Sequence, residues 1–457
     1  MYGRRPPLLA LTPAAPDASH TLVNFEPNDQ RSKARTFCKR SVAGIVAGAA
    51  LLLASSPVAA RAAAAPVTNT PAISGVTAAA AWGLGGSFSQ TQYNGMASED
   101  VSLVRNDASW SAIEPNPPGP SGPVFDFGSI DPEVTMLAVD HLTWLPVLDY
   151  SAPWAASVGN DPFSPPASDS DFAAYAQAVA ARYGAGGSFW AQNPQLPYEP
   201  VTTFEVWNEE NGGYFWDTGS QPAAYGKLYA ATRTAIKSTD PSAEVIVGGL
   251  VEPSADQFVT QMLSDDPSLR GNVDGFGLHP YDLDGDQVVA DVQSFRKTLD
   301  GLGESAAPID VTEFGWEYDS APGDETWRAD QMQEVAEALG NSDCGVQQLD
   351  PYSWVNDGGP DWGLADTTGA IRPAGAAWFT GLAVARSRPM TTLCASSSST
   401  STSRAKSSVT SQPKAITASF KTKKVDGRSK KQERKKAKRR SKRSTKPARR
   451  KASPKRS

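Results

Sequence analysis

Residues 201–209, with the sequence VTTFEVWNE, are the segment that decides the fold class of this chain. The segment is mostly β-branched and aromatic, and it ends in the polar pair Asn208-Glu209. An apolar run of this kind is typical of a parallel strand that is covered on both faces. Residues 308–316, PIDVTEFGW, repeat the pattern and carry a second glutamate, Glu313. Each segment therefore predicts a buried strand with a carboxylate near its carboxyl end.

Eight strand-like segments occur along the chain, and each is followed by a helical or loop stretch. They comprise residues 80–88, 101–107, 142–150, 201–209, 244–250, 273–281, 308–316 and 345–354. Helical patterns lie between them, at residues 171–183, 222–237, 325–339 and 373–386. Eight alternations predict an α/β fold built as a single (β/α)8 TIM barrel. An open doubly wound sheet is the alternative, although residues 83–86, GLGG, lack the spacing of a dinucleotide site.

Charge divides the chain into an acidic body and a basic end. Residues 67–395 hold 12 Lys and Arg against 44 Asp and Glu, whereas residues 404–457 hold 23 against 2. The Ser-rich and Lys/Arg-rich end cannot bury a core, so we expect it to be a disordered tail. The expected organisation is a leader at 1–65, a linker at 66–79, the barrel domain at 80–388 and the basic tail at 389–457.

The leader has the pattern of an export signal. Basic residues at 31–40 precede the apolar run 41–56, and small residues follow, with expected cleavage near Ala60 or Ala62. The apolar run is too short to favour a membrane span, although an uncleaved N-terminal anchor is the alternative. We therefore expect the protein to be secreted or associated with the cell surface.

The cysteines offer one pair in the mature chain. Cys38 would leave with the leader, and Cys344 and Cys394 remain. In a barrel, Cys344 lies just before the eighth strand and Cys394 follows the last helix, so both fall at the same end. A disulfide between them is expected, and two unrelated buried thiols are the alternative.

The two glutamates at strand ends provide the chemistry. Two carboxylates beside flat tryptophan rings are what acid/base cleavage of a glycosidic bond needs. The three histidines of the chain do not form metal-ligand spacings, and no nucleophile-elbow motif occurs. We therefore expect no metal and no cofactor.

Five blocks in order carry a family resemblance. They are RNDASWSAIEP with the following FDF and LPVLDY, then WNEENGGYFWDTGSQPAAYGKLYAATRTAIKSTDPSAEVIVGGL, DGFGLHPY, VTEFGW and WGLADTTGAIRPAGAAW. Together they resemble the clan A glycoside hydrolases, and family 39 (β-xylosidases and α-iduronidases, with its short bacterial members) most closely. Glu210 departs from the pattern, because the family usually has proline there.

The resemblance implies roles for individual residues. Glu209 after strand four is implied as the acid/base and Glu313 in strand seven as the nucleophile, with Asn208 bonding the sugar 2-hydroxyl. Arg105, at the end of strand two, is implied to keep the nucleophile ionised, and Tyr281 is implied to donate a hydrogen bond to the nucleophile. The other implied site residues are His279, Trp354 as a floor for the sugar, and Trp316 as a weaker platform. His279 could instead be a core histidine, and either tryptophan could serve packing alone.

These expectations combine into a secreted, retaining glycosidase that acts on a carbohydrate and works as a monomer. One alternative is a carbohydrate-binding barrel that has lost turnover. Another is a surface-attachment protein that acts through its tail. Residues 404–457 could bind an anionic cell-wall polymer or membrane surface, and nucleic acid is not expected as a partner because the chain is expected to be exported.

Overall fold

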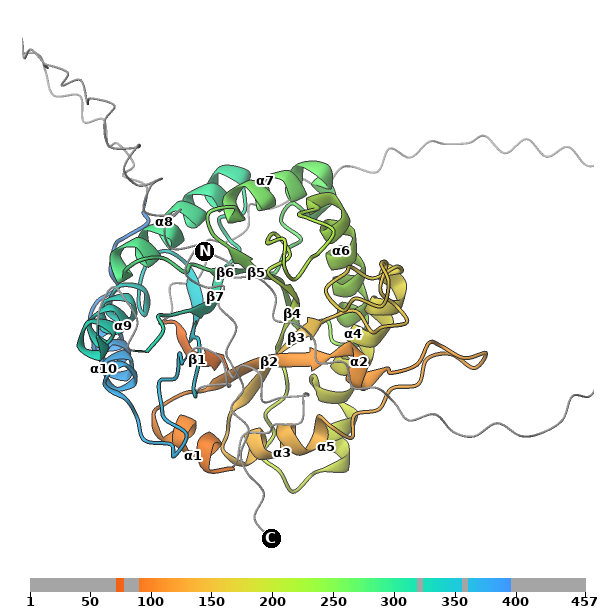
Figure 1. Ribbon diagram of the computed structural model, residues 1–457, viewed down its shortest axis with the longest axis horizontal. Coiled ribbons are helices and arrows are strands. Elements are labelled where there is room, and N and C mark those ends of the chain that lie inside the picture. Colours follow the sequence, from red (N-terminus) through yellow and green to blue (C-terminus); the bar gives the residue numbers. More distant parts are fainter. Residues whose placement is uncertain (1–70, 78–89, 319–323, 356–360, 396–457) are drawn as a thin grey trace, which may run out of the picture. The chain divides into compact units, whose positions relative to one another are not determined.

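The eight strands form a closed parallel barrel in chain order, with β1 paired to β8. The computed structural model describes residues 71–77, 90–318, 324–355 and 361–395. The strands are β1 (Ile73–Thr77), β2 (Leu103–Ser109), β3 (Thr143–Asp149), β4 (Thr203–Asn208), β5 (Glu244–Val251), β6 (Gly275–His279), β7 (Ile309–Phe314) and β8 (Val346–Pro351). Figure 1 shows the helices around this barrel, so the predicted (β/α)8 fold is confirmed.

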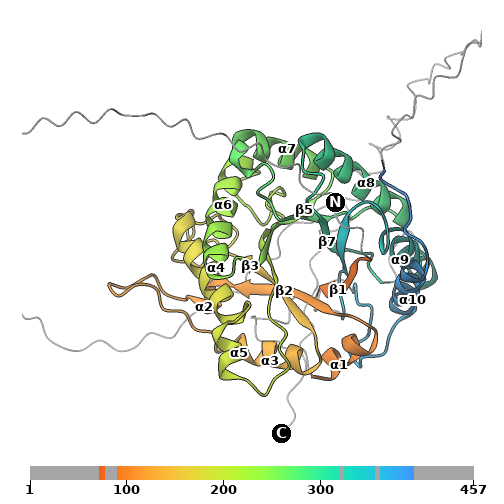
Figure 2. The same cartoon turned by 180° about the vertical axis from the view of Figure 1, so that it is seen from behind.

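The helices connect successive strands and cover the outside of the barrel, as the view from behind also shows (Figure 2). They are α1 (Gln90–Ser98), α2 (Trp110–Ile113), α3 (Asp131–Val139), α4 (Asp169–Tyr183), α5 (Ser188–Gln192), α6 (Pro222–Thr239), α7 (Ala255–Asp265), the short 3-10 helix η1 (Pro267–Leu269), α8 (Gly285–Leu302), α9 (Glu325–Leu339) and α10 (Pro373–Ser387). Within the described ranges, none of them is long and apolar enough to cross a membrane.

Helix α4 shows how local sequence sets these elements. The hydroxyl of Ser168 accepts a hydrogen bond from the backbone N–H of Asp171 at 3.2 Å, which caps the first turn. Phe172, Tyr175 and Val179 then recur at helical spacing and are fully buried against the barrel. The helix thus begins two residues before the predicted start at 171 and ends at Tyr183 as predicted.

Strands β4 and β7 alternate between apolar and polar side chains. Phe204, Val206 and Val311 are fully buried, as are the polar residues Glu205 and Thr312 beside them. The hydroxyl of Thr312 donates to Oε1 of Glu205 at 3.2 Å, and β4 and β7 are not neighbours in the barrel. The bond therefore crosses the interior, which is polar here although barrel interiors are usually filled by Val, Ile and Leu.

Asp310 shows most clearly that burying polar groups in this interior is unfavourable. It is fully buried, and neither carboxylate oxygen has a hydrogen-bond partner among the described residues. Burial, followed by the charges of Glu244 and Glu205, raises its pKa well above the usual range. Such a carboxyl is held protonated because a buried, unpaired charge is unfavourable.

The first strand was predicted wrongly. Strand β1 lies at Ile73–Thr77, within the expected linker 66–79, and it pairs with both β2 and β8. Residues 80–88, the expected strand, lie outside the described residues, and β1 precedes them in the chain. The segment ISGVT has only five residues, which is too short a pattern to stand out in the sequence, and its pairing with β2 and β8 is what makes it a barrel strand.

The C-terminal boundary of the barrel domain was also placed too early. Residues 389–395 belong to the folded unit, because the N–H of Thr391 donates to the carbonyl of Asn341 at 2.8 Å. Asp343 accepts from the backbone N–H groups of Leu393, Cys394 and Ala395 at 2.7, 2.8 and 2.9 Å. Cys344 and Cys394 form a disulfide. The leader at 1–65 and the tail from residue 396 lie outside the described residues, so the export signal and the basic tail stay predictions.

The disulfide should stabilise the barrel by tying the chain end to β8. Replacing both cysteines, Cys344→Ser with Cys394→Ser, should lower the free energy of unfolding by about 4 kcal/mol, because a closed loop of this length restricts the unfolded chain. Urea unfolding of the two proteins measures the difference. A loss below about 1 kcal/mol would show that the hydrogen bonds of Asp343 hold this segment without the disulfide.

Candidate active site

Glu209 and Glu313 meet at the carboxyl ends of β4 and β7. Glu209 follows Asn208, the last residue of β4, and Glu313 is the residue before the end of β7. Their side chains remain 17% and 12% exposed, although the strands around them are buried. One oxygen of each glutamate and Nδ1 of His279 all lie within 4.8 Å of one another. The fold therefore brings together two carboxylates that are 104 residues apart in the chain.

The backbone at the end of β4 is strained. Trp207 and Glu209 have φ angles of 69° and 51°, in the left-handed region that residues other than glycine rarely adopt. The indole N–H of Trp207 donates to the carbonyl of Phe215 at 2.8 Å, and the N–H of Glu209 donates to the carbonyl of Gly249 at 3.1 Å. These contacts hold a conformation that costs on the order of 1–3 kcal/mol per residue and that presents Glu209 beside Glu313.

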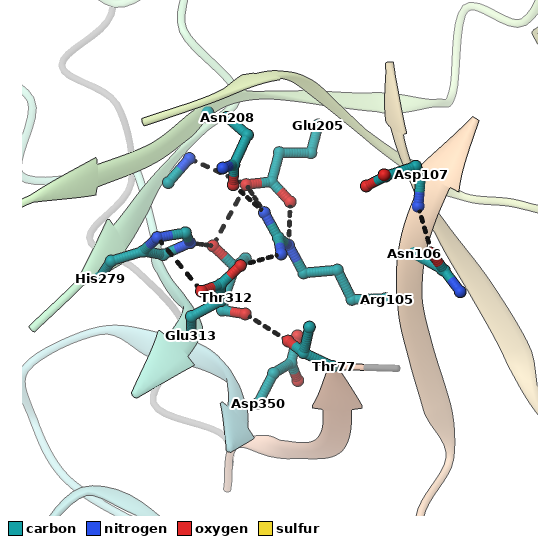
Figure 3. A network of polar contacts seen from close by, with 12 residues as sticks. Thr77, Arg105, Asn106, Asp107, Glu205, Asn208, His279, Thr312, Glu313 and Asp350 are labelled. Carbon is teal, nitrogen blue, oxygen red and sulfur yellow. Dashed lines mark hydrogen bonds and ion pairs between the residues drawn. The ribbon is translucent and has the colours of Figure 1, made fainter. Parts of the chain in front are cut away.

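Arg105 is the cation of the site. Its Nε and Nη2 donate to the carboxylate of Glu205 at 2.6 and 3.0 Å, and Nη2 also donates to Oδ1 of Asn208 at 2.8 Å. Its Nη1 donates to Oε1 of Glu313 at 2.6 Å (Figure 3). Arg105 does not end its strand as predicted, since β2 continues to Ser109, so it lies below the glutamates and its long side chain reaches up to them.

Glu313 is held in its ionised form. Burial raises its pKa, but His279, Arg105 and a hydrogen bond from Tyr281 outweigh that effect and hold the pKa below its usual range. The hydroxyl of Tyr281 donates to Oε2 of Glu313 at 2.9 Å. The predicted contacts of Arg105 and Tyr281 with Glu313 are therefore both present, and each stabilises the negative charge.

His279, the last residue of β6, contacts both glutamates. Its Nδ1 lies 3.0 Å from Oε1 of Glu209 and 3.7 Å from Oε2 of Glu313. Its Nε2 lies 3.1 Å from the hydroxyl oxygen of Thr312. Because Thr312 gives its own proton to Glu205, it can only accept from Nε2–H. Nδ1 and Glu209 therefore share one proton, which makes His279 part of the site and not only a core residue.

Asn208 is oriented by Arg105. Since its Oδ1 accepts from Arg105, its amide N–H₂ group is the donor that remains for a substrate. The side chain is 7% exposed and lies beside Glu205 and Arg105 (Figure 3). This orientation is compatible with the expected bond to a sugar hydroxyl.

The two tryptophans predicted as sugar contacts are placed elsewhere. Trp354 is fully buried, and its indole N–H donates to Oε1 of Gln92 on α1 at 2.7 Å. Trp316 is 7% exposed, packs edge to face against Trp327, and donates to the carbonyl of Asp282 at 2.9 Å. The prediction of Trp354 as a floor for the sugar is wrong, and Trp316 serves packing, because a covered ring has no free face for a sugar.

Sequence reasoning missed several contributors. Glu205 was seen only as part of a strand, yet it is the fully buried counter-ion of Arg105. Trp362 is partly exposed and meets Tyr281 edge to face, with ring centroids 5.7 Å apart. Trp362 is the first residue of the block WGLADTTGAIRPAGAAW, which was the signal that could have drawn attention to it.

Glu210 does not add a carboxylate to the open part of the site. It is fully buried, neither oxygen has a hydrogen bond of ordinary geometry among the described residues, and the backbone of Gly248 packs closely against it. Burial raises its pKa well above the usual range. Its carboxyl is therefore held neutral behind β4.

Two groups in the described part of the chain bring three metal-ligating atoms within 4.8 Å, and one of them is Glu209, His279 and Glu313. The other contains the two cysteines of the disulfide, whose sulfurs are bonded to each other and are not thiolate ligands. In the first group, the hydrogen bonds described above satisfy the three side chains. The expectation that no metal is used stays a prediction.

Residues 207–378 match the family model described as the glycosyl hydrolase catalytic core. The expected resemblance to clan A glycoside hydrolases, and to family 39 among them, is confirmed. A β-xylosidase from Geobacillus stearothermophilus is 37% identical over 78 residues, which are 17% of this chain and 15% of that protein. The aligned part is thus a small share of the relative's length.

Solved structures share the fold. A GH39 β-xylosidase from Caulobacter crescentus matches with a TM-score of 0.50 and 20% identity, over 69% of this chain and 72% of that chain. A family 39 glycoside hydrolase from Bacteroides cellulosilyticus matches with a TM-score of 0.54 and 16% identity, over 69% and 64% of the two chains. At these identities the likeness concerns the barrel itself.

The bond from Tyr281 to Glu313 should set the acid limb of activity. Removing it with Tyr281→Phe should raise the pKa of Glu313, so the loss of kcat/KM on acidification should begin at higher pH than in the unchanged protein. The measurement is kcat/KM against pH with a nitrophenyl glycoside. Tyr214→Phe, at an exposed tyrosine, is the control and should leave the acid limb in place. An unmoved limb in Tyr281→Phe would contradict the assigned role of this bond.

Proposed function

We propose that this protein is a retaining glycoside hydrolase that cleaves O-glycosidic bonds in an oligo- or polysaccharide by double displacement. The observation that carries the proposal is the approach of Glu209 and Glu313, whose nearest oxygens lie within 4.8 Å. Retaining enzymes hold their two carboxyl groups about 5–5.5 Å apart, whereas inverting enzymes leave about 6.5–9.5 Å for a water molecule. The short separation supports direct attack by a carboxylate on the sugar.

Glu209 acts as the general acid in the first step. It shares a proton with Nδ1 of His279, and that proton is available to the oxygen of the leaving group. Nε2 of His279 donates its own proton to the hydroxyl oxygen of Thr312, so the proton shared with Glu209 lies between Nδ1 and Oε1 of Glu209. In the second step Glu209 takes a proton from water, and His279 helps to hold it.

Glu313 acts as the nucleophile. Arg105 and Tyr281 each bind one of its oxygens, which keeps the carboxylate ionised and aimed. Attack on the anomeric carbon forms a glycosyl-enzyme bond and releases the leaving group that Glu209 has protonated. Water then breaks that bond and frees Glu313.

Two further side chains support the binding of a sugar. Asn208 precedes Glu209, and because its Oδ1 accepts from Arg105 it offers its amide donors, while Trp362 offers a partly exposed ring beside Tyr281. Polar donors fix hydroxyl groups, and an aromatic ring packs against the apolar face of a sugar. These two side chains fit a sugar ring that is rich in hydroxyl groups.

A mechanism-based inhibitor tests the nucleophile directly. A 2-deoxy-2-fluoro glycoside should form a stable ester with Glu313, which mass spectrometry of the peptides locates. Glu313→Gln should form no ester, because an amide is not a nucleophile here. If sugars bind and no label forms at Glu313 in the unchanged protein, the chain is a carbohydrate-binding barrel and the proposed function is wrong.

Substrates with different leaving groups test the role of Glu209 as the general acid. Glu209→Ala should lose roughly 10²–10⁴-fold in kcat/KM on substrates with poor leaving groups and much less on dinitrophenyl glycosides, which need little protonation. Glu210→Gln is the matched control, because it alters the adjacent carboxyl that points away from the site. It should keep the leaving-group dependence of the unchanged protein. Equal losses across leaving groups in Glu209→Ala would contradict its role as acid.

A further inference from the structure

Asp107 lies beside the catalytic residues and has no role in the mechanism above. It follows Arg105 by two residues in β2, so both side chains are on the same face of the strand, with Asp107 about 6.6 Å nearer the catalytic end. Figure 3 shows its carboxyl group turned toward Glu205 and Arg105, with no bond drawn to it. Its charge interacts with those of Arg105, Glu313 and Glu205.

Asp149 lies on the neighbouring strand β3 and interacts electrostatically with Asp107. It is the last residue of β3, is 1% exposed, and neither oxygen has a hydrogen bond of ordinary geometry within the described ranges. Burial, and next the charge of Asp107, raise the pKa of Asp149 well above its usual range. The pKa of Asp107 is raised to about 6, chiefly by burial. Near neutral pH, Asp149 is therefore protonated and Asp107 carries the negative charge.

We propose that Asp107, with Asp149 behind it, determines sugar specificity at the subsite next to Glu313. Asp107 accepts hydrogen bonds from the hydroxyl groups of a neutral sugar and excludes sugars that carry a carboxylate. This inference rests on the proposed function and names the class of sugar that the site takes.

The charges of the site favour this selection. A carboxylate accepts hydrogen bonds from sugar hydroxyls that are stronger than those of a neutral acceptor, so Asp107 binds a neutral sugar well. A uronate placed in the same subsite would bring a second negative charge beside Asp107 and Glu313. Arg105 cannot compensate, because four of its five N–H donors are already bonded to Glu205, Asn208 and Glu313.

The test compares pairs of nitrophenyl glycosides of one configuration that differ only in bearing a neutral group or a carboxylate at C6. The unchanged protein should favour the neutral member by roughly 10²-fold in kcat/KM. In Asp107→Asn, kcat/KM for the neutral sugar should fall roughly 10-fold, mainly through KM, and that for the uronide should rise by a similar factor. Asp149→Asn should shift the ratio in the same direction by less.

Asp265→Asn, at an exposed carboxylate on α7, is the matched control and should leave the ratio unchanged. A rise in kcat/KM for the uronide cannot come from misfolding. Asp107→Ser provides a second variant in which the negative charge is removed. A ratio unchanged within about twofold in both Asp107 variants overturns the inference. Absence of any hydrolysis and of any label at Glu313 in the unchanged protein would instead refute the proposed function.

Discussion

The rest of the site depends on the buried guanidinium of Arg105. A charge in a barrel interior must be paired, and Arg105 finds its partners on strands that are not its neighbours, Glu205 on β4 and Glu313 on β7. The planar fork of arginine satisfies both carboxylates and Asn208 at once. One residue therefore binds Glu313, orients the amide of Asn208 beside Glu209 and compensates the charge of Glu205.

A polar interior has a cost that the packing around it offsets. Asp149, Asp310 and Glu210 are buried carboxyls whose pKa values are raised mainly by burial. The outer shell is apolar and fully buried, with residues such as Val206 and Leu278 packed against the helices. This shell supplies stability that offsets the unfavourable burial of these carboxyl groups.

The sequence predicted the later strands well because each is a dense apolar run with clear breaks. It failed at β1, where a five-residue strand is formed by its pairing with β2 and β8 more than by its own pattern. It also failed at Trp354, since the direction of a side chain just after a strand depends on which helix packs there, and here Gln92 of α1 binds the indole. Neither fact is encoded locally.

The sequence by itself determined the barrel and the strand-end positions of Glu209 and Glu313, because hydrophobic period and residue type are local properties. The supports Arg105, Asn208 and Tyr281 were implied by the family resemblance. Only the tertiary structure decided the distance between the two carboxylates, the shared proton of His279, and the places of Glu205 and Asp107 in one charge network. The physical reason is that these are contacts across the barrel interior. Their geometry is set by how eight strands close on one another, and not by any one of them.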